Sequence, residues 1–555
     1  MDSLDDTILK YALQNAVGYN GRANPGSVIG RVLAERPDMK ANVKELNQAV
    51  MRIVKEVNSL SLEQQKEKLA GIAPELLVKE KKEREFKLPE LPDVKGSVVM
   101  RFAPNPSGPL HIGHSRVVLL TDEYVKRYGG RFINRFEDTD PARVDPEAYG
   151  IIPEDLKWLG ANVTETYYQS DRLEIYYDLA KKLLEKGHAY MCNCEPESWR
   201  ALKEKGAACP HRDATIEDST ALWDEMFDGS LKPEEASLII KTNLKDPNPA
   251  LRDYPILRIE DTPHPRCGTK YRVYPLMNFS VAVDDHLLGL THVLRGKDHL
   301  NNTYRQNYIY DYFGWAKPVF IHYGRVSIVG PELSTSKMSK GIREGVYSGW
   351  DDPRLGALRA LARRGFKQEA LREYWIRAGL NEVDVEFSWE TFFSLNKDII
   401  DPTSRRYFFV ADPILLPING VDRLEGKAPL HPSDKAAGFR MYSISKPVKV
   451  LIPKADSAAT MKVRLKDLCN VDVVDGKAAY AGNDIAAIKQ GYKIIHWVQE
   501  GSVPMEVLMP DGSKASGLGE KGLLREVGNV VQLERFGFAR VESAGEKIVA
   551  VFAHR

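Results

Sequence analysis

A strand, a rigid loop and a helix follow one another from residue 97 onward, ahead of a second strand that starts at residue 130. The segment SVVMRFAP reads as a short apolar strand, and it runs directly into PNPSGPLHIGHSR at residues 104–116. Three prolines stiffen the loop, which also holds one glycine, and two imidazoles follow three residues apart. A second strand, GRFINRFED, and a helical segment, PEAYGIIPEDLKWLG, come next. This alternation predicts a parallel sheet whose faces are covered by helices.

The alternation of strands and helices does not extend over the whole chain, and the places where it changes mark boundaries between segments. Residues 1–78 carry apolar side chains at helical spacing, and a charged, proline-containing linker follows to about Lys95. We interpret this linker as a solvated hinge rather than a basic arm on nucleic acid. Around residues 190–270, cysteines, prolines and short strands interrupt the alternation, which indicates an insertion. After residue 396, short strands between Gly, Pro and Asp turns predict β-barrels.

These changes predict six segments. They are a helical extension with its linker (1–95), the first half of the parallel-sheet domain (96–190), the insertion (191–272), the second half of that domain (273–330), a helical connecting segment (331–395) and the barrels (396–555).

Composition narrows the class of protein. The 555 residues are 43% hydrophobic and 28% charged, with a net charge of +1. No run of about 18 apolar residues occurs, so we expect no membrane span. The acidic N-terminal stretch is unlike a secretory signal, and five cysteines do not make a disulfide scaffold. We therefore expect a reduced, cytoplasmic protein. The net charge neither predicts nor excludes a polyanionic partner, because binding depends on local clusters.

The histidine turn has the chemistry of a phosphate site. A helix that starts after a strand presents free N–H groups and the positive end of its dipole. Gly108 and Gly113 let a ligand approach the backbone, and His111 and His114 can both donate hydrogen bonds to phosphate oxygens. A second segment, STSKMSKG at residues 334–341, contains two lysines that we expect in a flexible loop. Lysine suits a phosphate whose charge grows during a reaction.

The pair HIGH and KMSK resembles the signature of class I aminoacyl-tRNA synthetases. The segments RFAPNPSGPLHIGH, RFEDTDPARV, VDDHLLGLTHVLRGKDH and STSKMSKG are similar to glutamyl-tRNA synthetases of the archaeal type. That type shares its C-terminal β-barrels with glutaminyl-tRNA synthetases. The resemblance runs from about residue 97 to the end. It implies a multidomain α/β and β fold: a Rossmann-type catalytic domain with an inserted acceptor-stem domain, helical N-terminal and connecting parts, and anticodon-binding barrels.

The resemblance also implies a two-step reaction. L-Glutamate attacks the α-phosphate of ATP, which enters with Mg²⁺, and the adenylate then acylates the 3′ end of tRNA(Glu). Whether tRNA(Gln) is also charged with glutamate stays open, and the family implies a monomer. The implied catalytic residues are His111, His114, Lys337 and Lys340. The implied ATP contacts are Pro104, Asn105, Pro106, Ser107, Gly108, Pro109, Leu110, His111, Ile112, Gly113, His114 and Lys340.

Three residues correspond to the amino-acid pocket of the family. Arg101 and Arg295 match positions near the substrate side chain, and two guanidinium groups suit a γ-carboxylate better than a neutral amide. Glu137 matches the acidic residue that binds the substrate ammonium. Met277 departs from the pattern, because a tyrosine is usual at this position.

Cysteines in the insertion form a candidate zinc site. Cys192-x-Cys194 is followed after fourteen residues by Cys209-x-His211, and three thiolates with one imidazole suit tetrahedral Zn²⁺. A metal-free set of reduced cysteines is the alternative. A closed set of four ligands would be structural, since it leaves no open position for catalysis.

Three other functions compete with a glutamyl enzyme. A glutaminyl-tRNA synthetase would share the barrels, but Arg295 argues against it. A nucleotidyltransferase of the same superfamily would be shorter and would lack the barrels. A catalytically silent tRNA-binding relative is disfavoured by the intact His111, His114 and Lys340.

Overall fold

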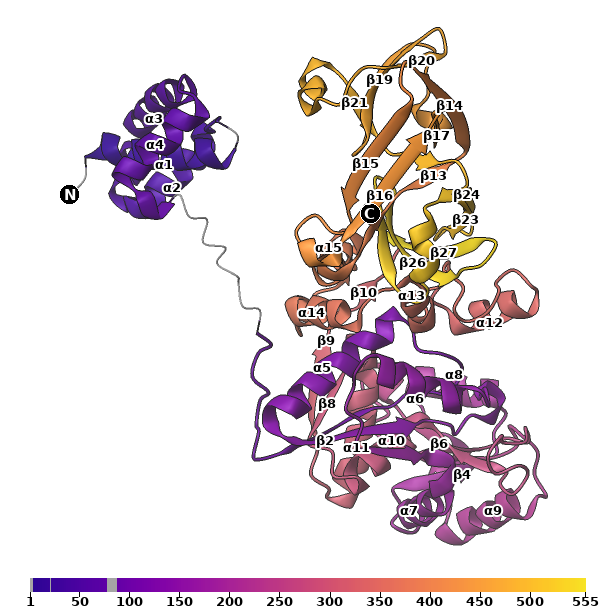
Figure 1. Cartoon of the computed structure of the whole chain (residues 1–555). Coiled ribbons are helices and arrows are strands. Elements are labelled where there is room, and N and C mark those ends of the chain that lie inside the picture. The colour runs from indigo at the N-terminus through magenta and orange to yellow at the C-terminus, as the bar shows by residue number, and fades with distance from the viewer. Residues whose placement is uncertain (1–2, 20, 77–86) are drawn as a thin grey trace. The chain divides into compact units, whose positions relative to one another are not determined.

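The computed structural model describes residues 3–19, 21–76 and 87–555. It divides into two compact units, Met1–Phe86 and Lys87–Arg555 (Figure 1). The first part of the predicted linker, residues 79–86, lies outside the described residues, and residues 87–95 contain no helix or strand. No helix in the described part of the chain is long and apolar enough to cross a membrane.

The first unit is helical, as predicted. Ser3 and Ser61 form capping boxes that fix the starts of two helices. Buried Gln65 donates hydrogen bonds to the carbonyls of Gly21, Val57 and Leu60, and so links three segments. Val43, at the start of the third helix, is exposed, whereas the apolar residues that follow it at helical spacing are buried. The helices are α1 (Leu4–Gly18), α2 (Pro25–Glu35), α3 (Val43–Asn58) and α4 (Leu62–Ile72).

The second unit is built on a parallel sheet. Strands pair in the order β1-β2-β3 and, separately, β8-β9, all parallel. Thr291, just before β8, joins the two groups, because its N–H donates to the Val99 carbonyl at 2.9 Å and its Oγ1 accepts from the Val99 N–H at 2.9 Å. The elements are β1 (Val98–Phe102), α5 (Ile112–Tyr128), β2 (Gly130–Phe136), α6 (Ala148–Trp158), β3 (Glu165–Tyr168), α10 (Met277–Leu287), β8 (His292–Gly296), α11 (Leu300–Phe313) and β9 (Val319–Tyr323).

The chain runs from β1 to β2 on one side and from β8 to β9 on the other. The boundary between β1 and β8 is therefore the point where the strand order reverses. Ligands of parallel α/β sheets bind at the carboxyl ends of the strands beside such a point. Arg101 in β1 and Arg295 in β8 lie near these ends.

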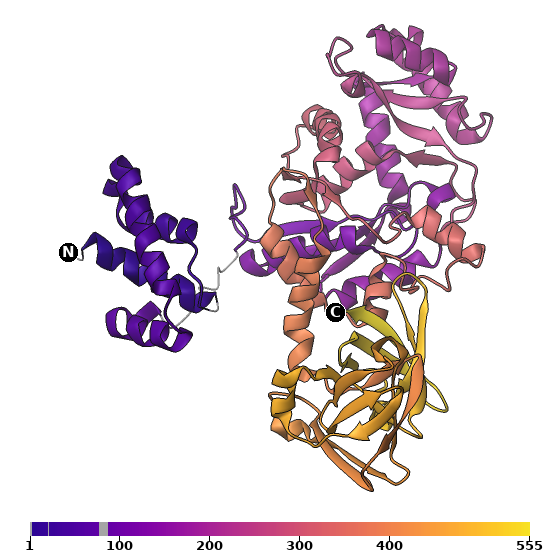
Figure 2. The ribbon, with the colours of Figure 1, turned by 90° about the horizontal axis from the view of Figure 1, so that it is seen from above.

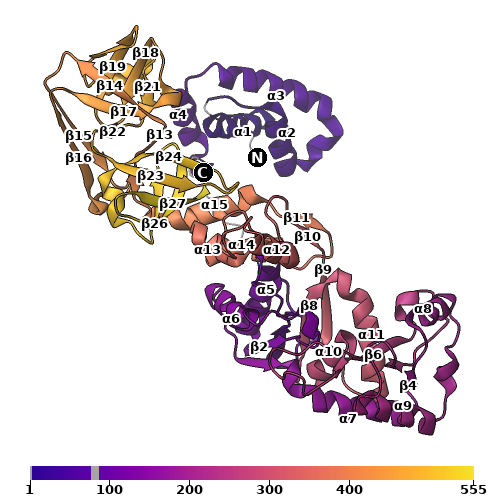
Figure 3. The ribbon, with the colours of Figure 1, turned by 90° about the vertical axis from the view of Figure 1, so that its right-hand side faces the viewer.

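An antiparallel sheet interrupts the parallel one. Its strands are ordered β4-β5-β6-β7, and helices pack beside them at one end of the unit (Figure 3). Trp223 and Met226 of α9 belong to its hydrophobic core. The elements are α7 (Leu173–Glu185), β4 (Ala189–Cys192), α8 (Pro196–Lys205), α9 (Ile216–Asp228), β5 (Ser237–Ile240), β6 (Tyr254–Ile259) and β7 (Val273–Pro275).

A helical segment leads to the C-terminal strands. The predicted loop around KMSK is wrong: residues 335–343 form helix α12, which Ser334 caps by accepting the Lys337 N–H at 3.5 Å. Buried Met338 anchors this helix, which explains its regular structure. The elements are β10 (Val326–Ser327), α12 (Thr335–Arg343), α13 (Leu358–Arg364), α14 (Gln368–Ala378), β11 (Val385–Glu386) and α15 (Trp389–Ile400).

Apart from short 3-10 helices, the C-terminal part is built of strands, which confirms the predicted fold class (Figure 2). Two seven-stranded sheets have the orders β12-β25-β26-β27-β23-β24-β13 and β21-β18-β19-β20-β14-β17-β22, and β15-β16 form a hairpin. The strands are β12 (Arg406–Tyr407), β13 (Phe409–Ala411), β14 (Pro413–Asn419), β15 (Arg423–Pro429), β16 (Phe439–Ser445), β17 (Lys449–Pro453), β18 (Met461–Leu465), β19 (Cys469–Val474), β20 (Lys477–Tyr480), β21 (Lys493–Ile495), β22 (Val498–Gln499), β23 (Val503–Leu508), β24 (Lys514–Gly519), β25 (Val530–Leu533), β26 (Gly537–Ser543) and β27 (Ile548–His554).

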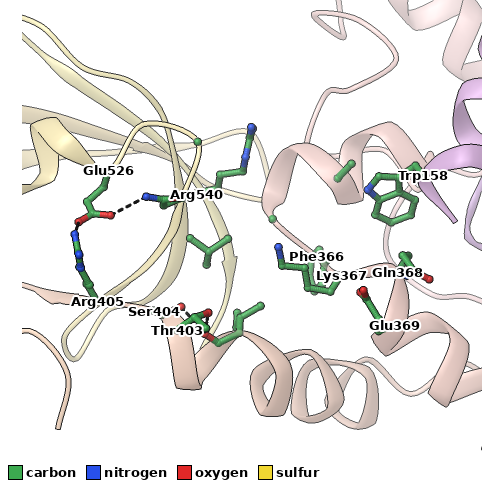
Figure 4. A pocket seen from close by; sticks show the side chains of 16 residues that line it. Trp158, Phe366, Lys367, Gln368, Glu369, Thr403, Ser404, Arg405, Glu526 and Arg540 are labelled. Atoms are coloured by element: carbon green, nitrogen blue, oxygen red, sulfur yellow. Dashed lines mark hydrogen bonds and ion pairs between the residues drawn. The ribbon is translucent and has the colours of Figure 1, made fainter. Parts of the chain in front are cut away.

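A cavity of about 590 Å³ lies between the start of α14 and the loop before β25 (Figure 4). Trp158, Lys367 and Arg540 are among its lining residues, and Arg405 pairs there with Glu526 at 3.0 Å. None of the site residues predicted from the sequence lines it.

Candidate active site

The two histidines stack at the start of α5. His111 is the N-cap residue in extended conformation, and its Nδ1 accepts the Gly113 N–H at 3.0 Å. His114 lies in the first turn, and its Nδ1 accepts the His111 N–H at 3.3 Å. The ring centroids are 3.8 Å apart with an interplanar angle of 26°. The side chains thus act as the helix cap, which a histidine pair rarely provides.

This capping fixes the protonation state of both rings. Because each Nδ1 accepts a backbone N–H, the remaining proton of each neutral ring belongs on Nε2. Burial lowers the pKa of His111 to about 4. Burial, with the neighbouring ring, lowers the pKa of His114 well below its usual value. The pair therefore offers two neutral N–H donors at neutral pH.

The loop before the histidines is anchored by distant segments. The Leu110 N–H donates to Asp155 Oδ2 at 2.8 Å, and the Leu358 N–H donates to the Leu110 carbonyl at 2.9 Å. The Ile112 N–H donates to the Gly356 carbonyl at 3.0 Å. Burial raises the pKa of Asp155 to about 6, against the opposing effects of the Leu110 N–H and Arg359.

A pocket of about 280 Å³ lies between this loop and the start of α12. Gly108 has a φ of +148°, and a Cβ there would stand 2.5 Å from Thr335 Cγ2, so only glycine allows the close approach. Pro106, Ile112, Gly113 and Lys340 do not line the pocket. The predicted ATP contacts that do line it are Pro104, Asn105, Ser107, Gly108, Pro109, Leu110, His111 and His114, and Leu333, Ser334 and Thr335 close the opposite side.

The two lysines of α12 lie at the surface. Lys337 Nζ is 3.7 Å from Glu332, and Lys340 Nζ is 3.8 Å from Glu344. Their side chains are 73% and 69% exposed. The structure thus brings the start of α12 to the pocket and leaves both ammonium groups outside it, free to change conformation at little cost.

Beyond the histidines lies a buried network of charges. Arg135 Nη1 donates to Asp285 Oδ1 at 2.7 Å, and Arg135 Nη2 donates to Glu137 Oε1 at 3.2 Å. Arg101 reaches Asp285 only through Nε, at 3.5 Å, and its terminal nitrogens have no partner among the described residues. Burial raises the pKa of Glu137. Burial would also raise the pKa of Asp285, but Arg101 and Arg135 outweigh it and leave that pKa lowered.

Arg295 has a different environment. It donates to Gln306 Oε1 at 3.0 Å and to Thr303 Oγ1 at 2.5 Å, and its guanidinium lies 4.4 Å from the centre of the Phe320 ring. Burial and the like charge of Arg101 lower its pKa to about 10. No carboxylate in the described part of the chain lies within 4.0 Å of it, so Arg295 has no direct ion pair, and Asp285 and Glu137 act on its charge only from a greater distance.

Sequence reasoning missed the residues that support these arginines. Arg135 and Asp285 are fully buried. Both lie inside segments quoted for the family resemblance, and that position was the sequence signal that could have singled them out. Met277 begins α10, and the next residue, Asn278, accepts a hydrogen bond from Gln306 Nε2 at 3.4 Å. The polar side chain of Asn278 therefore directly follows Met277, which stands where the family usually has a tyrosine.

The four predicted metal ligands converge. Their ligand atoms all lie within 4.8 Å of one another. Sγ–Sγ distances are 3.4 Å for Cys192–Cys209 and 3.5 Å for Cys194–Cys209, and His211 Nδ1 is 3.3–3.7 Å from all three sulfurs. Zinc–sulfur bonds of about 2.3 Å in a tetrahedron set the sulfurs about 3.8 Å apart. The donor set and the geometry therefore fit zinc.

Family models of known proteins match three consecutive segments of the chain. The model of the catalytic domain of class I tRNA synthetases (E and Q) matches residues 97–402. Two anticodon-binding domain models of the same group match residues 404–492 and 494–542.

Curated relatives are similar over the whole chain. The glutamate–tRNA ligase of Methanocaldococcus jannaschii is 50% identical, covering 100% of both chains. That of Methanoculleus marisnigri is 48% identical, covering 100% of this chain and 99% of its own. A crystal structure of a glutamate–tRNA synthetase from Elizabethkingia anophelis aligns with a TM-score of 0.38 and 24% identity, over 56% of this chain and 71% of that one. The chain belongs to the class I tRNA synthetases of the E and Q group.

Proposed function

We propose that this protein is a glutamate–tRNA ligase that forms glutamyl-adenylate from glutamate and ATP and transfers the glutamyl group to tRNA(Glu). The observation that carries the choice of amino acid is the excess of positive charge beside β1 and β8. Four arginines, Arg101, Arg135, Arg172 and Arg295, face three carboxylates, Glu137, Asp284 and Asp285. Free glutamate carries one net negative charge and balances this excess. Glutamine is neutral and would leave a buried charge uncompensated.

The roles in the first step follow from the chemistry. The α-carboxylate of glutamate is already ionised and attacks the α-phosphorus of ATP, so no general base is required. The step then depends on positioning and on charge stabilisation as pyrophosphate leaves. The Nε2–H groups of His111 and His114 donate hydrogen bonds to phosphate oxygens of ATP. Lys340 and Lys337 approach the phosphates from α12. Magnesium enters with ATP, and no residue of this chain is assigned to it.

The amino-acid contacts complete the proposal. Arg101 and Arg295 bind the γ-carboxylate, and Glu137 binds the ammonium group.

The transfer step needs the 3′ end of tRNA at the same pocket. We assign the acceptor end to residues 191–272 and the anticodon to residues 396–555, which agrees with the anticodon-binding models that match there. The proposed enzyme is a cytoplasmic monomer.

The zinc site belongs to the proposal as a structural element. Cys192, Cys194, Cys209 and His211 would hold the ion, which ties β4 to the segment after α8. All four positions of a tetrahedral ion are filled by protein ligands, so zinc supplies rigidity here and no chemistry.

The deciding experiment is charging of purified tRNA(Glu) and tRNA(Gln), each offered labelled glutamate or labelled glutamine. Glutamate on tRNA(Glu) supports the proposal. Glutamate on both tRNAs adds a relaxed anticodon preference, and glutamate on tRNA(Glu) alone assigns a strict one to the barrels. Glutamine on tRNA(Gln), without glutamate on tRNA(Glu), overturns the roles of Arg101 and Arg295.

A further inference from the structure

Two neutral residues hold Arg295 in place. Gln306 Oε1 accepts from its Nη1, and Thr303 Oγ1 accepts from its Nη2. The two acceptors are three residues apart on α11 and therefore project from the same face of that helix. They accept hydrogen bonds from both terminal nitrogens of the guanidinium, which fixes the plane of the group.

The two acceptors are themselves fixed. Gln306 is 1% exposed and donates to Asn278 Oδ1 at 3.4 Å. Thr303 is 6% exposed, and its Oγ1 lies 2.8 Å from His322 Nε2. Their orientation therefore comes from the packing of α10, α11 and β9, and it does not require a bound substrate.

Arg135 and Arg295 differ in the charge of the groups that orient them. Arg135 is oriented by carboxylates, Asp285 at 2.7 Å and Glu137 at 3.2 Å, and its charge is compensated within the protein. Arg295 has equally defined hydrogen bonds, but its acceptors are an amide and a hydroxyl. A carboxylate ligand gains far more from an uncompensated guanidinium than from one that is already ion-paired.

We propose that Thr303 and Gln306 are positioning residues that orient Arg295 without neutralising it, and that they thereby determine the preference for glutamate over glutamine. This inference rests on the proposed glutamate–tRNA ligase function. It assigns the specificity to two uncharged side chains that do not need to touch the substrate. A carboxylate at either position would compensate Arg295 internally and remove the advantage of an anionic substrate.

The substitution Gln306→Glu tests this directly, because it preserves the shape and adds one negative charge beside Arg295. The matched control is Asn301→Asp, which adds the same charge to the exposed start of α11 and keeps the acceptor that Asn301 offers to Asn248. KM and kcat for glutamate, glutamine and ATP are measured by pyrophosphate exchange in the presence of tRNA(Glu), together with the melting temperature.

We expect Gln306→Glu to raise KM for glutamate by about 10-fold to 100-fold, within the range by which a mispaired polar group in a pocket alters substrate choice. KM for ATP stays unchanged, the glutamate-to-glutamine ratio of kcat/KM falls, and Asn301→Asp resembles the wild type. An unchanged ratio, or equal losses for glutamate and ATP, overturns the inference.

A second variant keeps the test decisive if Gln306→Glu does not fold. Thr303→Val removes one acceptor from Arg295 and keeps the side-chain shape, so KM for glutamate should rise about fivefold while kcat changes little, as for the loss of one hydrogen bond to a charged group. A wild-type KM for glutamate in that variant overturns the inference. Failure of the underlying function is distinguishable, because the wild type itself would then not use glutamate.

Discussion

Removal of the metal from the Cys192, Cys194, Cys209 and His211 site should destabilise the inserted sheet and leave the parallel sheet folded. The sulfurs that are 3.4–3.5 Å apart need to separate by only about 0.3 Å to hold zinc with ordinary bonds. The site is therefore pre-formed. Zinc at 1,000 times its Kd would stabilise the folded state by about 4 kcal/mol. For a part the size of the insertion, residues 191–272, this corresponds to a loss of about 16–32 °C in its melting temperature when the metal is removed.

The assay combines metal analysis with calorimetry. Protein purified without chelator should contain one zinc per chain, and X-ray absorption should give three zinc–sulfur distances near 2.3 Å and one zinc–nitrogen distance near 2.0 Å. Cys209→Ser should lose the metal and lower the first calorimetric transition. Cys267→Ser is the matched control, because Cys267 is half-buried and lies outside the cluster. A wild type that binds no zinc, or whose melting curve stays the same when its zinc is removed, would refute the reasoning.

Three further predictions concern the active site. Lys340→Ala should slow adenylate formation by ~10²-fold or more, as for the loss of one charge-stabilising contact, and an unchanged exchange rate would remove α12 from the mechanism. Arg295→Cys should weaken the use of glutamate far more than the binding of ATP, and unchanged discrimination between glutamate and glutamine would exclude Arg295 from the pocket. Asp155→Asn should make stability less dependent on pH. The pKa of Asp155 is raised to about 6, so the folded state holds an extra proton between its ordinary pKa and pH 6, and the wild type loses stability as pH rises through this window. The melting temperature of the variant relative to the wild type should therefore rise from pH 5 to pH 8, by the equivalent of about 1.5 kcal/mol, and parallel curves would contradict it.

Local sequence patterns were sufficient where the chemistry is local. The histidines of the α5 cap are three residues apart, and each cysteine or histidine of the metal site has a partner two residues away. Spacing of this kind predicts proximity directly, because the chain connects the groups over a few bonds. The alternation of strand and helix likewise predicted the parallel sheet, since each element buries one face against the next.

The residues that support the proposed amino-acid pocket could not be predicted in this way. Asp285 meets Arg101 across 184 residues of sequence, and only the folded sheet brings them together. Thr303 and Gln306 are close to Arg295 in sequence, but nothing in a threonine or a glutamine indicates a buried contact to an arginine. The helix around KMSK was missed for the opposite reason: serines and lysines are typical of loops, and the burial of Met338 that stabilises the helix is a tertiary effect.

The electrostatics of the pocket bear on the order of events in the proposed reaction. Neutral His111 and His114 can hold ATP phosphates by hydrogen bonds, but they add no charge to the ground state. The mobile charges, Lys337 and Lys340, are exposed on α12 at the rim of the same pocket. A cation that reaches the phosphates only as negative charge develops stabilises the transition state more than bound ATP, and such differential binding raises kcat rather than affinity. The buried arginines have the opposite purpose in this proposal, because the γ-carboxylate that we assign to them keeps its charge throughout the reaction. In the proposed reaction, fixed charge would therefore select the amino acid, and the exposed lysines would stabilise the transition state.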